Sequence, residues 1–203
     1  MFRYAQSSHE YLVTQLQHTG SETIAPGTTT SQFNIRLNLN HPVKYLAWVV
    51  KHKDGQHGRF ITESAADDYK DSLLKYDERY GVIDTVKLQL NGHDRFSARK
   101  GSYFNLVQPF EHLKTRPVAG VYLYSFALKP EEHQPSGTCN FSRIDNATLI
   151  VTTKACVGAN VGTIDEEHQT LATGAANLTN LLIFGESYNV LRIMSGMGGL
   201  AYS

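Results

Sequence analysis

The sequence predicts an all-β protein, a single jelly-roll β-sandwich of the eight-stranded type with one or two short helices in its loops. Apolar and polar residues alternate with period two in most of the apolar segments, as in strands that bury one face. Helical spacing is confined to two short stretches. The 203 residues are enough for one large all-β domain with a full hydrophobic core.

We expect one domain, because the chain shows no internal repeat and no low-complexity linker. Residues 1–30 are predicted to form an N-terminal segment with the first strand, and residues 31–194 the jelly roll. Residues 195–203 form a glycine-rich C-terminal tail, which we expect to lack a regular element because glycine is costly to order.

Two strands are predicted in the first quarter of the chain. Residues 33–39 alternate between apolar and polar, which indicates a strand with one wet face. Pro42 is expected to interrupt the ladder. Residues 43–50 are apolar on nearly both faces and predict a central strand. A polar, glycine-containing loop is expected at 51–58.

The helical spacing falls in two places. Ser64 can cap a helix together with Asp67, and Gly81 is a natural stop for it. Apolar residues in 103–110 predict one further helical turn, which Pro109 and the segment after it are expected to end.

The remaining strands follow from alternation and from β-branched or aromatic content. A strand over 86–90 leads into Asn91-Gly92, which is the strongest short hairpin signal because a type I′ turn needs positive φ at both positions. The strongest strand is predicted at 121–128, stopped by Pro130. The last predicted strands are 147–153, 181–184 and 188–193, with a break at 185–187 between the final two.

Composition narrows the classes of function. Lys plus Arg equals Asp plus Glu at 19 each, which argues against a nucleic-acid groove and suits a surface that packs against copies of itself. Cys139 and Cys156 are too few for a disulfide framework, so we expect two reduced, partly buried thiols. The N-terminus does not resemble a signal peptide, and no apolar run approaches the roughly 20 residues that span a bilayer. We therefore expect a soluble product.

The sequence predicts no catalytic, cofactor-binding or metal site. The closest histidines, His52 and His57, lie in a charged stretch without a third ligand nearby, whereas a cupin-type site needs several converging ligands. The others are scattered singly: His9, His18, His41, His93, His112, His133 and His168. The acidic pairs at 67–68, 131–132 and 166–167 are expected to be solvated. The motifs of serine hydrolases, P-loop enzymes and zinc proteases do not occur.

Three sequons begin at Asn140, Asn146 and Asn177, and the sequence leaves open whether any of them carries a glycan. Asn140 and Asn146 can instead bond the backbone where a strand begins, as can Ser142 and Asp145.

Side chains around that segment suggest packing and interface roles. Arg143 and Asp145 can form an ion pair, and the sequence leaves open whether it is buried or interfacial, or solvated. Residues 135–137 predict a tight turn. Tyr122, Tyr124 and Phe126 are expected to supply packing area between the sheets.

Four long strings carry a family resemblance: residues 103–112, 120–128, 135–146 and 188–203. They resemble the major capsid protein of the nucleocytoplasmic large DNA viruses, the group with phycodnavirus, iridovirus, asfarvirus and mimivirus-type coats. The resemblance is clear from Ile83 to Ser203 and looser back to Phe33.

The resemblance implies a structural double-jelly-roll protein, three copies of which form a homotrimeric capsomer of pseudo-hexagonal outline. Such capsomers tile the icosahedral shell of a virion over an inner membrane, fixed by minor capsid proteins, without direct nucleic-acid contact and with assembly in the host cytoplasm. The strings belong to the second jelly roll of that family. Because this chain is long enough for one jelly roll, we expect it to be the C-terminal half, and whether Met1 is a true start stays open.

Three alternatives remain at this point. One is a single-jelly-roll vertex (penton) or minor capsid protein. Another is a carbohydrate-binding jelly-roll module that would use aromatic residues near Phe60, Tyr69 or Tyr80. The third is a cupin-like metalloenzyme.

Overall fold

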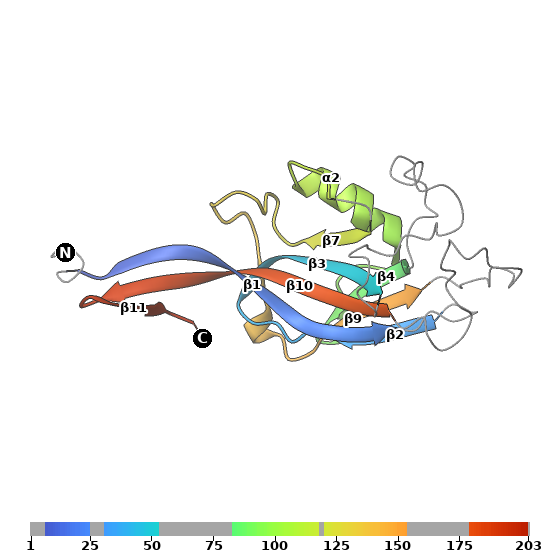
Figure 1. Ribbon diagram of the computed structural model, residues 1–203, viewed down its shortest axis with the longest axis horizontal. Helices are drawn as coiled ribbons and strands as arrows, with labels where there is room; N and C mark the ends of the chain where they lie inside the picture. Colours follow the sequence, from blue (N-terminus) through green and yellow to red (C-terminus); the bar gives the residue numbers. More distant parts are fainter. Residues whose placement is uncertain (1–6, 25–30, 53–82, 118–119, 154–178, 203) are drawn as a thin grey trace, which may run out of the picture.

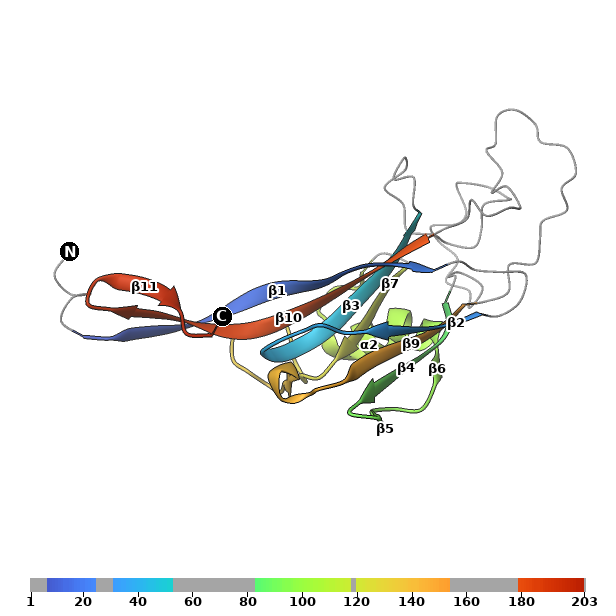
Figure 2. The ribbon, with the colours of Figure 1, turned by 90° about the horizontal axis from the view of Figure 1, so that it is seen from below.

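The computed structural model describes residues 7–24, 31–52, 83–117, 120–153 and 179–202. These residues form two antiparallel β-sheets packed face to face, from which one long set of strands extends to one side (Figure 1 and Figure 2). The predicted all-β jelly roll is confirmed.

The first sheet has the strand order β1-β10-β3-β7, in which β8 also pairs with β3 and β11 with β10. Its strands are β1 (His9–Ile24), β3 (Pro42–His52), β7 (Val121–Ser125), β8 (Cys139–Asn140), β10 (Thr179–Met194) and β11 (Met197–Leu200).

The second sheet has the order β2-β9-β4-β5, and β6 pairs with the far end of β4. Its strands are β2 (Ser31–Arg36), β4 (Ile83–Leu90), β5 (His93–Asp94), β6 (Arg99–Lys100) and β9 (Ala147–Thr153). The first strand lies beside the last long strand, and the chain repeatedly crosses between the sheets. This is the connectivity of a jelly roll.

The core consists of the apolar side chains on the two inner faces. Along β9, alternate residues are buried, as the period-two pattern predicted. Trp48 of β3 and Leu88 of β4 are fully buried from opposite sheets. Full burial of one such side chain contributes about 1.5–3 kcal/mol, so the inner faces supply the main stabilisation of the fold.

A helical segment closes the side of the sandwich between β7 and β4. It consists of a π-helical turn, Tyr103–Val107, and then α2 (Gln108–His112). Phe104 is fully buried, with its ring centroid 5.3 Å from that of Trp48. At Gly101 a Cβ atom would lie 2.6 Å from the carbonyl oxygen of Ile83, so only glycine fits there.

The prediction that Pro109 and the segment after it end this helix is wrong for Pro109, because the helix continues to His112 and ends only with the segment that follows. The Gln108 N–H bonds the carbonyl oxygen of Tyr103, five residues back. Proline lacks an N–H and its ring crowds the preceding turn of an α-helix. The widened π-helical turn directly before Pro109 accommodates both effects.

Two predicted strands are shorter than expected. The first ends at Arg36, although Leu37 and Leu39 beyond it remain buried. Pro42, expected to interrupt the ladder, is instead the first residue of β3, a position that tolerates a missing N–H.

The strand predicted to run to Leu128 ends at Ser125. The Ser125 hydroxyl donates to the Ala127 carbonyl at 2.7 Å, and the N–H groups of both Phe126 and Ala127 donate to the Lys44 carbonyl. Phe126 and Ala127 thus lie opposite the single residue Lys44, which is a β-bulge. The pairing of β7 with β3 therefore stops well before Pro130.

The predicted break at 185–187 is also wrong, because β10 is continuous from Thr179 to Met194. Gly185 lies inside the strand, where a Cβ atom would come within 3.1 Å of the Leu39 side chain. The glycine therefore permits close packing rather than a turn.

Both tight hairpins are made by two residues with positive φ. Asn91 and Gly92 have φ of 50° and 81°, which confirms the predicted hairpin between β4 and β5. Ser195 and Gly196 have φ of 52° and 80° and join β10 to β11. The expectation that the C-terminal tail has no regular element is therefore wrong, because this turn sets up backbone pairing that needs no side chains.

The helix predicted from Ser64 to Gly81 lies outside the described residues, as do His57, His168, Cys156, Asn177 and the aromatic residues of the carbohydrate-binding alternative. Within the described ranges, no helix is long and apolar enough to cross a membrane.

Candidate assembly surfaces

The ionisable side chains of the described residues do not converge on a reaction centre. Among them, no three His, Cys, Asp or Glu residues are placed to hold a metal ion. His18 stacks on Phe184, and the His41 ring lies near that of Tyr202. Burial raises the pKa of the Cys139 thiol, which keeps it protonated and unreactive.

The segment from Pro135 to Asn146 holds strand ends together. Asn140 accepts a hydrogen bond from the Ser142 N–H at 3.1 Å, and the Ser142 hydroxyl accepts one from the His41 N–H at 2.8 Å. The predicted backbone roles of Asn140 and Ser142 are confirmed. At Asn146 the bonds run through its own backbone, and the side chain that contributes is Asn91.

Arg143 and Asp145 are both exposed, so the alternative of a buried ion pair between them is wrong. The Asp145 carbonyl accepts a hydrogen bond from the Arg36 side chain at 3.5 Å. Tyr122 of β7 stacks on Trp48, its cross-strand neighbour in the same sheet, with centroids 6.1 Å apart. Tyr124 provides the expected contact between the sheets, since its ring lies 4.7 Å from that of Phe96, which follows β5. The aromatic residues of β7 therefore pack against both β3 and the segment after β5, and Arg36 ties the end of β2 to the segment before β9.

A buried ionic cluster fixes β3 to β10. The Lys44 ammonium lies 3.0 Å from the Glu186 carboxylate, donates to the Pro130 carbonyl at 3.1 Å and sits over the Tyr188 ring. Burial alone would raise the pKa of Glu186, but hydrogen bonds from Tyr45 and Lys44 outweigh it and hold that pKa below its usual value. Burial, together with Glu186, raises the pKa of Tyr45.

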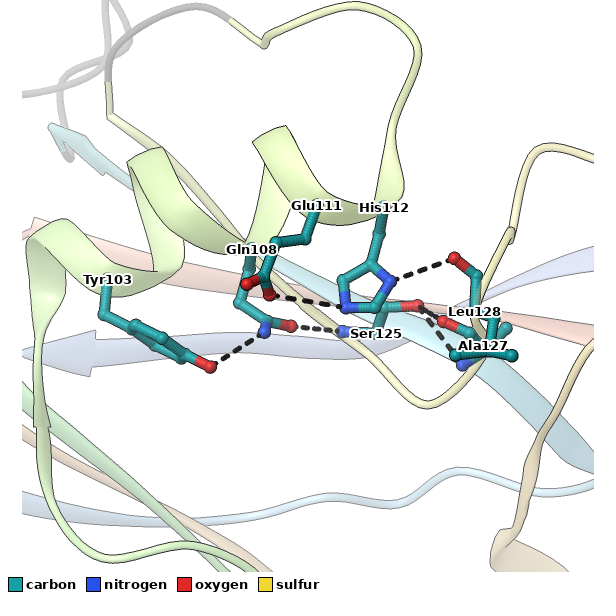
Figure 3. A network of polar contacts seen from close by, with 7 residues as sticks. All are labelled: Tyr103, Gln108, Glu111, His112, Ser125, Ala127 and Leu128. Carbon is teal, nitrogen blue, oxygen red and sulfur yellow. Dashed lines mark hydrogen bonds and ion pairs between the residues drawn. The ribbon is translucent and has the colours of Figure 1, made fainter.

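Polar side chains anchor the inner side of the helical segment (Figure 3). The buried Gln108 donates to the Tyr103 hydroxyl at 3.0 Å and accepts from the Ser125 N–H at 3.1 Å. The His112 ring bonds the Leu128 carbonyl at 3.0 Å, which fixes the bulge after β7 against the end of α2.

The outer side of this segment is apolar. Phe110 is 86% exposed and Leu128 is 72% exposed, both beside the last turn of α2, and Val107 lies one turn earlier. We call Val107, Phe110 and Leu128 the helix patch. The hydrogen bonds of Gln108 and His112 fasten the backbone beneath this patch to β7 and to the chain that follows it.

A second apolar surface lies on strands that extend past the sandwich. The N-terminal part of β1, the C-terminal part of β10 and β11 project together beyond the second sheet (Figure 2). We call these strands the arm. Its exposed large apolar side chains are Tyr11, Met194, Met197, Leu200 and Tyr202. Tyr11 and Leu200 share one face of the arm because both lie opposite Leu191, whereas Met194 and Met197 lie on the other face.

The base of the arm is fixed by a buried amide. Asn189 is 1% exposed and donates to the Gln15 side chain at 3.1 Å and to the Tyr202 carbonyl at 2.8 Å. The Ala201 N–H donates to the Val190 carbonyl, which fastens the chain after β11 to β10. The arm is therefore held in place at its base.

Sequence reasoning missed both surfaces. The signals available were Met194 and Met197 on either side of a turn, and Phe110 directly after Pro109. The sequence alone could not show that these side chains are exposed, because exposure depends on whether another layer of the fold covers the strand or helix that carries them.

The family model for the large eukaryotic DNA virus major capsid protein matches residues 2–199. The major capsid protein of Paramecium bursaria Chlorella virus 1 is 50% identical over 220 residues, covering 99% of this chain and 50% of the relative. That of Pyramimonas orientalis virus is 42% identical, covering 99% of this chain and 45% of the relative. The chain thus spans about half the length of the curated relatives it matches.

Solved structures agree. A quasi-atomic model of the PBCV-1 virus capsid matches with a TM-score of 0.80 and 48% identity, over 99% of this chain and 53% of that one. The Faustovirus major capsid protein matches with a TM-score of 0.56 at 15% identity, over 94% of this chain and 34% of that one, and so shows the fold alone.

Proposed function

Because the chain belongs to the large eukaryotic DNA virus major capsid protein family, we propose that it is a structural subunit of an icosahedral virus shell. The observation that carries this proposal is the likeness to the PBCV-1 capsid over 99% of the chain, in sequence and in fold. The relatives are structural proteins rather than enzymes, and the proposed role requires no catalytic residue or cofactor.

The proposed unit of assembly is a trimer. The chain forms one jelly roll and spans about half the length of its curated relatives, so we propose that it supplies one jelly roll of a double-jelly-roll subunit. Three such subunits would form a capsomer of pseudo-hexagonal outline. The balanced charge supports close packing of identical copies and argues against direct contact with nucleic acid.

We further propose that the capsomers contact one another, minor capsid proteins and an inner viral membrane, and that assembly takes place in the host cytoplasm. Family membership supports these partners. It also favours a major capsid protein over a vertex protein or a carbohydrate-binding module, since the matched relatives are major capsid proteins.

The experiment is peptide mass spectrometry of purified virus particles, together with negative-stain microscopy of the purified capsomer. We expect peptides from this chain among the most abundant virion proteins, and particles with three-fold symmetry. A protein that is absent from virions and strictly monomeric would contradict the proposal.

A further inference from the structure

The two faces of the arm differ in charge. Side chains that lie opposite each other in neighbouring strands share a face, as do alternate side chains along one strand. One face carries Glu10 and Arg192, which lie opposite each other and form an ion pair of 2.8 Å. Among the described residues of the arm, the other face carries no Asp, Glu, Lys or Arg. Its apolar side chains, which we call the apolar arm face, are Tyr11, Val13, Leu191, Ile193 and Leu200.

The apolar arm face continues the face of the first sheet that lines the core. Ile183, Leu191 and Ile193 occupy alternate positions along β10 and therefore share one face. In the body the second sheet covers this face, and Ile183 is fully buried. The second sheet does not extend over the arm (Figure 2), where Tyr11 is 46% exposed and Leu200 is 52% exposed. The arm thus presents a core-type surface without its covering layer.

This pattern indicates a sheet that is packed on one side. A sheet with one charged face and one uncharged apolar face is typical of strands that face water on one side and another layer on the other. The helix patch lacks this separation, because Phe110 is followed directly by the exposed Glu111 and Leu128 by the exposed Lys129. Of the two exposed apolar surfaces, the apolar arm face therefore has the stronger character of a contact surface.

The position of the chain ends indicates what covers this face. The chain spans about half the length of its curated relatives, and the proposed function gives each subunit a second jelly roll. Strand β1 begins at His9, opposite Ile193 near the tip of the arm, and Tyr202 follows β11 (Figure 1). Whichever of these ends is joined to the second jelly roll, the connection starts from the arm. A covalently joined partner is also present at a far higher effective concentration than a separate protein.

We propose that the apolar arm face packs against the second jelly roll of the same subunit. That jelly roll supplies over the arm the layer that the second sheet supplies over the body. The inference rests on the proposed function, since only a double-jelly-roll subunit contains this partner. The surface that meets the arm is apolar, because a charged group buried there would find no opposite charge on the apolar arm face. The opposite face, with Met194 and Met197, stays outside this contact.

Hydroxyl-radical footprinting tests whether the face is covered. It compares this chain alone with capsomers purified from virus particles. Modification of Tyr11 should be about tenfold lower in the capsomer, because a side chain at the centre of an interface is packed as in a protein interior. Met197 is the internal reference, since it is 76% exposed on the opposite face of the arm and should be oxidised to a similar extent in both samples. Equal modification of Tyr11 in the two samples would overturn the proposal.

Photo-crosslinking identifies the occupant. The full-length subunit carries the photoreactive residue benzoylphenylalanine in place of Tyr11, or in place of Met197 as the control. The Tyr11 position should give a product with the mass of one subunit, and its linked peptide should come from the second jelly roll. The Met197 position should give few such links. Links from the Tyr11 position mainly to another copy of this chain, or to a minor capsid protein, would show a different occupant and overturn the proposal.

Two matched variants of β11 test the energetic role of the face. Leu200 and Met197 are both exposed apolar residues, so Leu200→Asp and Met197→Asp should leave the urea midpoint of the isolated chain unchanged. In the full-length subunit, the yield of trimeric capsomers should fall about tenfold for Leu200→Asp, because a buried unpaired carboxylate is costly, and little for Met197→Asp.

The outcomes separate this contact from the proposed function. Capsomers that form equally well with Leu200→Asp, or in which Tyr11 stays exposed, would refute the contact while the proposed function stands. A chain that is absent from virus particles and forms no capsomers would overturn both.

Discussion

Strand β10 passes through two environments, the sandwich body and the arm. In the body Ile183 is fully buried between the sheets, whereas Met194 at the other end of the same strand is 51% exposed. Both ends carry apolar side chains and full backbone pairing. The difference is the second sheet, which lies opposite the body and not opposite the arm (Figure 2). We conclude that the apolar residues of the body stabilise the fold, whereas the exposed apolar residues of the arm contribute little to its stability.

The largest expected effect comes from comparing these two residues directly. Ile183→Ala should lower the free energy of unfolding by about 2–5 kcal/mol, because it removes a packed side chain and leaves a cavity. Met194→Ala on the same strand should change it by no more than about 0.5 kcal/mol. Urea denaturation of both variants measures this, and similar losses would contradict the distinction between body and arm.

The second largest effect on stability is expected from the ion pair between Lys44 and Glu186 in the body. Lys44→Met leaves the Glu186 carboxylate and the Pro130 carbonyl without their cation. We expect a loss of about 1–3 kcal/mol in the free energy of unfolding, less than for a fully buried pair because Glu186 keeps some access to water. The double variant Lys44→Met/Glu186→Gln should recover part of this loss, since no unpaired charge remains. A double-mutant cycle with no coupling would refute the account of this cluster.

The same cluster predicts a dependence on pH. The folded protein holds the pKa of Glu186 below its usual value, so the full stabilisation by this carboxylate is present at pH values above that usual pKa. The stabilisation is lost as the pH falls through the lowered pKa. Urea midpoints measured from about pH 6 down to about pH 3 should therefore fall more steeply for the wild type than for Glu186→Gln. If the urea midpoints of the wild type and of Glu186→Gln fell equally with pH, Glu186 would contribute nothing to the loss of stability in acid.

The smallest effect is expected in the arm. Gly196→Ala should destabilise the β10–β11 turn by about 1 kcal/mol, because the position has a φ of 80° that side chains disfavour. Gly199→Ala is the matched control, with open space around its Cβ position and no positive φ. Amide exchange should quicken in β11 for the first variant only, with the body unchanged. Faster exchange throughout the body would mean that the arm and the body unfold together.

The sequence predicted the body better than the arm. The strand at 147–153 and the Asn91-Gly92 hairpin were correct, because each is governed by local pattern and turn chemistry. The break at 185–187 was wrong, because a glycine chosen for close packing against Leu39 looks the same in sequence as a turn glycine. Alternation also reveals which residues share a face, but not whether another layer covers that face.

The family was recognisable from the long strings near the C-terminus, whereas the assembly surfaces were not. Phe110 and Leu128 come from separate segments that His112 brings together, so no sequence spacing marks them as neighbours. Met197 lies in a glycine-rich stretch that folds into a strand only because Ser195 and Gly196 form a two-residue turn. Such surfaces depend on tertiary structure.

Hydrogen–deuterium exchange of the wild-type chain tests the distinction between body and arm most directly. We predict that the amides of β4 and β9 in the body exchange only through global unfolding, whereas those of β11 in the arm exchange faster through local opening. Equal protection of β11 and of the body strands would contradict the claim that the second sheet, which covers the body and not the arm, stabilises these strands.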